Sequence, residues 1–432
     1  NVFDFMKTLL KLFSIGVLAL GMASCSNDEG STLGVANTRA VTIITDNVTT
    51  NTTWSGEIEL AKKIAVVGQG VTLTIQPGTI IRGQATGTPQ DATALIITKG
   101  AKINAIGTST NPIVMTAKNG TVGGWGGLVI LGKAPINQSG TKYIEGIIEG
   151  SLPGVDTSYG GTDPNDDSGV LQYVRVEYAG ATIGSNNELN SFTFGGVGSG
   201  TTIDHCQAYY GDDDGFEFFG GTVNADHLVA IGTTDDSFDF DFGYTGTIQF
   251  AVSTVASSRL TSDPNGIECD NDASGSLSTP YTHPVLSNLT IIGSQNGTSL
   301  KSAADFRRNC EFTLVNSVLY GFPRGILKET ANSTYTLENN VVVAAPAGSG
   351  INFSTSPSTT GTFTPSSTNS GLTSYGDIVL NNPWGGYKTI GLRPTANPAL
   401  TGFTSVPGIQ AVTYKGAVAP TGQNWLTGTW IR

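Results

Sequence analysis

The stretch Ile203–Asn224, IDHCQAYYGDDDGFEFFGGTVN, is followed directly by Ala225–Gly246, ADHLVAIGTTDDSFDFDFGYTG. At an offset of 22 residues the two stretches share eight identities, which are Asp204/Asp226, His205/His227, Ala208/Ala230, Asp213/Asp235, Asp214/Asp236, Phe216/Phe238, Phe218/Phe240 and Gly221/Gly243. A tandem repeat of this length is typical of a solenoid, in which each repeat buries its apolar face against its neighbours. The two stretches therefore predict two consecutive turns of a solenoid.

Alternation within each repeat indicates the type of solenoid. Glu217 lies between two phenylalanines and so does Asp239, which is the period of two of a β-strand. Gly and Asp residues follow where the chain must turn a corner. Leucine-rich repeats would need regular leucines and a helix, and neither pattern is visible. The repeats resemble the right-handed β-helix proteins of the pectin-lyase-like class, so we expect an all-β fold: a single right-handed parallel β-helix over residues 41–432, with loop insertions and capped ends.

The repeat register extends along the chain with insertions at the corners. The aligned segments are Gly215–Phe218, Ser237–Phe240, Gly266–Cys269, Asp305–Arg308, Gly325–Lys328 and Gly350–Phe353. This alignment predicts one inward column of Phe216, Phe238, Ile267, Phe306, Ile326 and Ile351. It predicts an outward column of Glu217, Asp239, Glu268 and Arg307. Trp425 and Trp430 are expected to cap the C-terminal end of the solenoid.

Composition limits the class of protein. The 432 residues include 57 glycines and only 13% charged residues, which suits β-structure with many tight corners. The formal net charge is −12, and no basic patch is present to neutralise phosphates, which argues against nucleic acid as a partner. An acidic surface fits a secreted or cell-surface protein that meets cations.

The N-terminal residues carry a targeting signal. Lys7, the apolar run Leu9–Leu20 and the sequence LGMASC ending at Cys25 resemble a bacterial lipoprotein signal peptide, with Cys25 as the lipidated residue. The following Ser26–Glu29, SNDE, is similar to the export signal of surface lipoproteins in Bacteroidota-type bacteria. We therefore expect a signal peptide over residues 1–25 and a flexible tether over residues 26–40. The resemblance implies a lipid anchor in the outer membrane and a folded body that faces the cell exterior.

Three further cysteines, Cys206, Cys269 and Cys310, leave an odd number outside the cytoplasm, so at least one is expected to be a free thiol. In the repeat register Cys206 aligns with Leu228, and Cys269 aligns with Phe218 and Phe240. Both are therefore predicted to be buried apolar residues rather than zinc ligands. Disulfide or free thiol remains open for the three.

The outward positions predict a ladder of carboxylates. Adjacent rungs of a parallel β-helix lie about 4.8 Å apart, so stacked carboxylates repel one another unless a cation, a nearby Arg or a raised pKa compensates. Calcium takes six to eight oxygen ligands from such sets. The candidate metal ligands are Asp213, Asp214, Glu217, Asp235, Asp236, Asp239, Asp241, Glu268 and Asp270.

Three interpretations of the ladder stay open. The corner aspartates could simply accept turn hydrogen bonds from the backbone. The ladder could bind Ca²⁺. It could also cleave polysaccharide, with Glu217, Asp239 and Glu268 supplying carboxylates for hydrolysis, or with Ca²⁺ and Arg307 as the base of a lyase. The motif set of polygalacturonases is absent, apart from Asp213–Asp214. His205 and His227 should stack outward, as a solvated pair beside Asp204 and Asp226 or as part of a metal site.

Residues 168–272 also resemble a family of large β-helix surface lipoproteins. The resemblance implies the β-helix fold and a surface-exposed outer-membrane lipoprotein. With the acidic ladder, it leads us to expect a protein that binds cations and a glycan or a neighbouring envelope protein. The alternatives are an anionic-polysaccharide lyase or glycoside hydrolase, and an adhesin or accessory subunit of an outer-membrane uptake complex.

Overall fold

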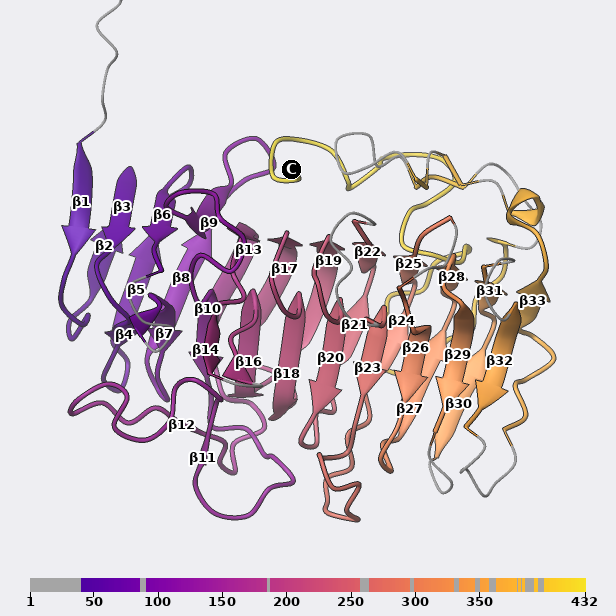
Figure 1. Ribbon diagram of the computed structural model, residues 1–432, viewed down its shortest axis with the longest axis horizontal. Coiled ribbons are helices and arrows are strands. Elements are labelled where there is room, and N and C mark those ends of the chain that lie inside the picture. Colours follow the sequence, from indigo (N-terminus) through magenta and orange to yellow (C-terminus); the bar gives the residue numbers. More distant parts are fainter. Residues whose placement is uncertain are drawn as a thin grey trace, which may run out of the picture. The chain divides into compact units, whose positions relative to one another are not determined.

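Short strands follow one another in a single direction and stack into rungs, as the period of two predicts (Figure 1). The structure is a computed structural model. It describes residues 40–432 except 86–90, 185–186, 257–263, 296–298, 330–333, 346–349, 357–362, 379, 382, 385–391 and 395–399. The expected signal peptide, its Cys25 and nearly all of the expected tether lie outside the described residues. Within the described part, no helix has both the length and the apolar character needed to cross a membrane.

One face of each rung belongs to a 10-stranded parallel sheet, called sheet B. Its strands in spatial order are β4 (Ile64–Val66), β7 (Leu95–Ile97), β10 (Leu128–Leu131), β16 (Phe192–Val197), β18 (Phe216–Gly221), β20 (Phe238–Asp241), β23 (Ile267–Cys269), β26 (Ser302–Phe306), β29 (Arg324–Lys328) and β32 (Ile351–Thr355). The order follows the sequence, so each rung adds one strand to this sheet.

The other two faces form a 19-stranded sheet, called sheet A. Its strands are β1 (Val41–Ile44), β2 (Thr52–Trp54), β3 (Glu57–Leu60), β5 (Thr72–Ile75), β6 (Ile80–Gly83), β8 (Lys102–Ile106), β9 (Ile113–Ala117), β13 (Gly169–Glu177), β17 (Thr202–Tyr209), β19 (Asn224–Ile231), β21 (Thr247–Gln249), β22 (Val252–Thr254), β24 (Val285–Ser287), β25 (Thr290–Ile292), β27 (Phe312–Val315), β28 (Val318–Tyr320), β30 (Tyr335–Glu338), β31 (Val341–Val343) and β33 (Ser370–Leu372). Strands β13, β17 and β19 are long enough to pair with both rows. Three strands per rung make this the predicted right-handed parallel β-helix.

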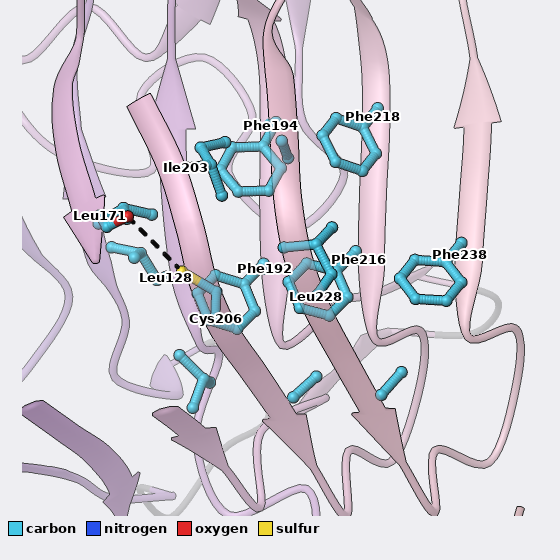
Figure 2. Close-up of a cluster of buried hydrophobic side chains, with 14 of the residues drawn as sticks. Leu128, Leu171, Phe192, Phe194, Ile203, Cys206, Phe216, Phe218, Leu228 and Phe238 are labelled. Carbon is cyan, nitrogen blue, oxygen red and sulfur yellow. Dashed lines mark hydrogen bonds between the residues drawn. The ribbon is translucent and has the colours of Figure 1, made fainter. Parts of the chain in front are cut away.

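Stacked phenylalanines fill the interior of the central rungs (Figure 2). The ring centroids of Phe194 and Phe218 lie 4.9 Å apart, and those of Phe218 and Phe240 lie 5.4 Å apart. Cys206 points into the same core, where its Sγ lies 3.9 Å from the carbonyl oxygen of Leu171. The predicted burial of Cys206 and Cys269 is confirmed, and Cys310 is buried as well. All three are free thiols.

The predicted register is correct for the first three aligned segments and wrong for the next. Glu217 pairs with Asp239, and Asp239 pairs with Glu268, as expected. Glu268 then pairs with Asp305 instead of Arg307, a shift of two residues that keeps the same side chains inward. The 39-residue spacing across this corner carries no repeat from which the offset could be read.

Two separate shifts change which side chains stack in the inward column: Ala304 takes the place predicted for Phe306, and Phe353 takes the place predicted for Ile351. Ile326 pairs with Ala304 and with Phe353. Phe353 packs on the core, whereas Ile351, predicted to point inward, is 46% exposed. The column is therefore Phe216, Phe238, Ile267, Ala304, Ile326 and Phe353.

The C-terminal tail does not cap the last rung. After β33 the chain forms a short 3-10 helix, η2 (Tyr375–Asp377), and then runs back along sheet A towards β13, drawn in yellow in Figure 1. Trp430 reaches Tyr173 on β13, with ring centroids 5.8 Å apart. The prediction that Trp425 and Trp430 cover the C-terminal end is therefore wrong, because the tail is long enough to return to the middle of the solenoid.

One insertion covers the outer side of sheet B. Between β10 and β13 the chain leaves the solenoid and forms the small hairpin of β11 (Lys142–Tyr143) and β12 (Ser158–Tyr159). A second small pair, β14 (Thr182–Gly184) and β15 (Asn187–Glu188), follows. The insertion buries Ile144, Ile147, Leu152 and Tyr159 against Ile96, Val129, Leu131 and Phe219 of sheet B. This outer layer shields side chains that strand alternation alone would leave in solvent.

Candidate functional site

The acidic site consists of outward side chains from neighbouring strands of sheet B and from the corner before them. Glu217 on β18, Asp239 on β20 and Glu268 on β23 lie side by side in the register. Asp241 is two residues beyond Asp239 and pairs with Phe219. The structure therefore brings these predicted ligands together. We call the set of Asp213, Asp214, Glu217, Asp235, Asp236, Asp239 and Asp241 the acidic cluster.

Two corner aspartates have a structural role. The Asp214 carboxylate accepts a hydrogen bond of 2.8 Å from the backbone N–H of Asp236, one rung further on. The Asp236 carboxylate in turn accepts one of 2.5 Å from the N–H of Asn265. Each carboxylate thus ties its corner to the next, as the turn-hydrogen-bond interpretation expects. These bonds use one oxygen of each group, so the same residues still offer oxygen atoms to a ligand.

Two groups of three carboxylates are close enough to share a cation. Asp213, Asp214 and Asp235 each offer an oxygen within 4.8 Å of the others, and so do Asp214, Glu217 and Asp239. Asp214 belongs to both groups and joins them. Oδ1 of Asp239 is buried without a hydrogen-bond partner among the described residues. An unpartnered buried carboxylate oxygen is energetically costly unless a cation or a proton compensates it.

Basic side chains neutralise the other end of the array. The Arg307 guanidinium pairs with Glu268 and binds both oxygens of Asp270 at 2.9 and 2.7 Å. Arg308 contacts Asp270 at 2.6 Å, and Lys301 contacts Asp305 at 2.5 Å. Glu268 and Asp270, predicted as metal ligands, are therefore held in ion pairs. We predicted that Arg307 would follow Glu268 in the outward column. Instead Asp305 occupies that position, and the Arg307 side chain binds Asp270 and Glu268.

Burial and like charge act together on the acidic cluster. Glu217 is 8% exposed and Asp236 is 4% exposed, and the insertion between β10 and β13 packs against neighbouring residues of sheet B such as Phe219. The N–H of Asn137 in this insertion donates to the carbonyl of Phe242, and its side chain donates to the carbonyl of Asn271. Burial raises the pKa of Glu217, and the charge of Asp239 adds to that increase. Burial likewise raises the pKa of Asp239, and the charge of Glu268 contributes. Asp214, Glu217 and Asp236 are buried, whereas the other members of the cluster are half-buried or, at Asp235, exposed.

Glu268 and Glu145 titrate near neutrality. Burial raises the pKa of Glu268 to about 7, against the opposing charge of Arg307. Glu145 lies on the insertion, and burial raises its pKa to about 7 as well. The charge of Glu145 also raises the pKa of Glu217, so the insertion contributes an acidic group to the cluster. The position of Glu145 near Glu217 depends on how the insertion folds back over sheet B, which an alignment of the repeats does not predict.

Arg307 is poorly suited to act as a base. Burial would lower the pKa of its guanidinium, but the ion pairs with Asp270 and Glu268 outweigh this effect and raise it. A base must lose its proton, and these partners hold the proton in place. The lyase mechanism that uses Arg307 as the base is therefore not favoured by this arrangement.

Removing the Arg307 side chain should destabilise the fold. We expect Arg307→Ala to lower the free energy of unfolding by about 1–3 kcal/mol, because Glu268 and Asp270 would lose their main cationic partner. Urea unfolding measures the change. Arg324→Ala, on exposed Arg324 of the next strand, is the matched control and should stay within about 0.5 kcal/mol of wild type. Equal effects of the two substitutions would contradict the ion-pair assignment.

A groove lies beside the acidic cluster. It has a volume of about 590 Å³ and is lined by Lys99, from the turn after β7, and by residues of the insertion that include Tyr143, Asp156 and Tyr159. The ring of Tyr159 lies 6.2 Å from that of Phe219, which pairs with Asp241. Burial raises the pKa of Tyr159, and the charges of Asp241 and Glu217 add to the increase. Tyr159 therefore connects the groove to the cluster, and the groove combines aromatic, cationic, acidic and hydroxyl groups.

A second constellation was only partly predictable. His205 and His227 stack outward as expected, with ring centroids 4.3 Å apart. Both rings lie against Asp204, and the C-terminal tail covers them through Trp425 and Trp430. The stacking of the two histidines was predictable because they occupy the same position in two consecutive repeats. The tryptophans that cover them were not, because they come from a segment without repeats.

Comparison with known proteins agrees with the architecture. A family model described as a pectate-lyase-like β-helix domain matches residues 43–375, which is more than half of the 432 residues. No curated protein and no solved structure matches the chain. The matched range begins in β1 and ends at η2, so it spans the rungs of both sheets. The chain belongs to the pectate-lyase-like β-helix domain family.

Proposed function

We propose that this protein is a cell-surface lipoprotein whose β-helix binds Ca²⁺ at the acidic cluster and an anionic glycan in the adjoining groove. The observation that carries the proposal is the convergence of Asp214, Glu217 and Asp239, whose oxygens lie within 4.8 Å of one another. Carboxylates brought this close in a buried setting repel one another, and a bound cation relieves that repulsion.

The ligand chemistry favours calcium. All groups in the acidic cluster are carboxylates, and Ca²⁺ binds six to eight oxygens in flexible geometry. Asp239 contributes an oxygen that has no hydrogen-bond partner among the described residues. Asp213 and Asp235 lie at the corner and are more exposed than Asp214 and Asp236, which gives an entry path from solvent.

The groove supports the glycan part of the proposal. Its volume of about 590 Å³ lies within the usual range for ligand sites. Tyr143 offers a ring and a hydroxyl to a sugar, and Lys99, whose Nζ lies 3.6 Å from the Asp156 carboxylate, offers a positive charge to an acidic one. A calcium ion in the neighbouring cluster would add a second positive charge for a uronate carboxylate. The anchoring part of the proposal rests on the Cys25 motif and the acidic residues that follow it.

Calorimetry tests the cation. The protein that begins after the proposed lipidation site should bind Ca²⁺ when the ion is titrated into a buffer free of other metals. The double variant Glu217→Gln/Asp239→Asn should lose at least about tenfold in affinity, because each substitution replaces a charged carboxylate by a neutral amide. Glu338→Gln, which removes a carboxylate from β30 of sheet A, should bind like wild type. Absence of binding by wild type, or equal binding by the double variant, would refute the calcium site.

Cleavage of an anionic polysaccharide is the second candidate. Glu145 and Glu268 have pKa values raised to about 7, which suits a general acid near neutral pH. Incubation with acidic polysaccharides, with and without Ca²⁺, separates the candidates. New reducing ends that disappear with Glu145→Gln would favour an enzyme, whereas glycan retention without cleavage would favour binding.

A further inference from the structure

His205 and His227 occupy one corner position that repeats along sheet A. Each corner residue comes directly after a strand residue that pairs with its equivalent on the next rung. These strand residues are Gln172, Asp204, Asp226, Gln249, Ser287, Val315 and Glu338. The corner residues are Tyr173, His205, His227, Phe250, Asn288, Asn316 and Asn339, and each has a positive φ between 51° and 58°. Asn is the ordinary residue for such a left-handed corner. Two consecutive rungs place an imidazole there instead.

The two imidazoles converge on one carboxylate oxygen. Nδ1 of His205 and Nδ1 of His227 each lie 2.8 Å from Oδ1 of Asp204. The rings stack at 4.3 Å with 22° between their planes. Gln172 donates a hydrogen bond of 3.1 Å to Oδ2 and orients the carboxylate. Asp204, His205 and His227 thus offer one ligand atom each within 4.8 Å of one another.

The C-terminal tail encloses this group. Trp430 lies 5.3 Å from the His205 ring, and Trp425 lies 4.9 Å from the His227 ring. Arg175 donates hydrogen bonds to the carbonyls of Thr429 and Trp430, which fastens the tail to β13. The side chains of His205 and His227 keep only 13% and 25% of their surface exposed. An apolar shell of this kind strengthens ligand–metal interactions by excluding water.

We propose that Asp204, His205 and His227 bind a divalent transition-metal ion, with Zn²⁺ as the representative, beneath the C-terminal tail. Two imidazole nitrogens and a carboxylate oxygen are a preferred donor set for such ions, and a fourth position is left for water or another ligand. On binding, each neutral imidazole places its proton on Nε2, so that the Nδ1 lone pair faces the metal. No other atom needs to be gained or lost.

The charge of the group suits a metal, because the Asp204 carboxyl group supplies negative charge beside two imidazoles. Asp226 pairs with Asp204 on the adjacent rung and adds a further carboxylate next to His227 in the sequence.

This site is chemically distinct from the acidic cluster. Imidazole nitrogens select borderline-soft ions, whereas the all-oxygen acidic cluster selects hard ions such as Ca²⁺. The two sites also lie on different sheets, since β17 and β19 belong to sheet A. Failure of one proposal leaves the other standing.

The test uses protein without an affinity tag, because the chain contains only three histidines. Calorimetric titration with Zn²⁺ should show one site per chain in wild type, and Co²⁺ should give the visible absorption of a nitrogen-ligated ion. His227→Asn should weaken binding by at least about a hundredfold, more than the loss typical of a second-shell change. Asn is tolerated at this corner in three later rungs, so the variant should fold.

His283→Asn is the matched control. His283 contacts Glu311 and Thr313 away from the proposed site, so its replacement should leave Zn²⁺ affinity unchanged. His205→Asn provides a second ligand variant, and circular dichroism checks that each variant is folded. Absence of Zn²⁺ binding by wild type would overturn the proposal. So would equal affinity in folded His205→Asn or His227→Asn, or loss of affinity in His283→Asn alone.

Discussion

Without Ca²⁺, the melting temperature of this protein should fall as the pH rises from about 4 to about 7. Burial raises the pKa of Glu268 to about 7 in the folded state, compared with about 4.3 in an unfolded chain. Burial also raises the pKa of Asp214, Glu217, Asp236 and Asp239. A carboxyl with a raised folded-state pKa favours the folded state while it is protonated, so its contribution is present below the unfolded pKa and lost through the folded pKa.

The size of this effect is large. Glu268 alone contributes on the order of 3 kcal/mol between the two ends of the pH range, since each pKa unit corresponds to about 1.4 kcal/mol. Calcium should reverse the trend, because it binds the deprotonated cluster and stabilises the folded state by mass action. Thermal unfolding at several pH values, with chelator and with excess Ca²⁺, measures both effects.

Asp239→Asn is the informative variant for this prediction. It removes one carboxylate from the centre of the cluster, so the chelated protein should lose less stability with rising pH and should gain less from Ca²⁺. Glu338→Gln should retain the wild-type slope and the wild-type response. A flat melting temperature between pH 4 and pH 7 in chelator would contradict the assignment of buried, mutually repelling carboxyls.

Phe218→Ala should lower the free energy of unfolding by about 3–5 kcal/mol. Phe218 is fully buried and stacks on Phe194 and Phe240, and its ring also lies 4.8 Å from that of Tyr244. The substitution removes ring contacts to both adjacent rungs and leaves a cavity that the stacked neighbours cannot fill. Denaturant unfolding followed by circular dichroism gives the change in midpoint.

A comparison of substitutions at Ile351 and Phe353 tests the strand register that the structure shows for the last strand of sheet B. Ile351→Ala should cost less than about 0.5 kcal/mol, because Ile351 is 46% exposed on the last strand of sheet B. Phe353→Ala should cost more than Ile351→Ala, since Phe353 pairs with inward Ile326 and packs on the core. A larger loss for Ile351→Ala would support the original alignment, in which Ile351 points inward.

Much of the fold was predictable because a β-helix repeats locally. Phe216 and Phe238 stack as the 22-residue offset requires, and Glu217 and Asp239 stack beside them. These contacts join residues of adjacent rungs, so the spacing of identical residues directly encodes the pairing. The candidate ligands could be named for the same reason, as could the burial of Cys206 and the stacking of His205 on His227.

The burial and the partners of these residues could not be predicted in this way. Asn137 bonds to Asn271 across 134 residues, and Arg432 reaches Glu177 across 255 residues. Such contacts depend on how an insertion and a tail fold back on the solenoid, and neither segment has a period. The 39-residue spacing before Phe306 likewise conceals the offset that sets Glu268 against Asp305.

The amino-acid sequence by itself determined the solenoid, its direction of stacking and the side chains that face outward in the central rungs, because alternation and repeat length are local properties of the chain. Only the tertiary structure decided that Asp214, Glu217 and Asp236 are buried, that Arg307 pairs with Glu268 and Asp270, and that Trp425 and Trp430 enclose the two histidines. Each of these outcomes depends on contacts between distant segments, whose free energy is set by packing and by charge rather than by local pattern.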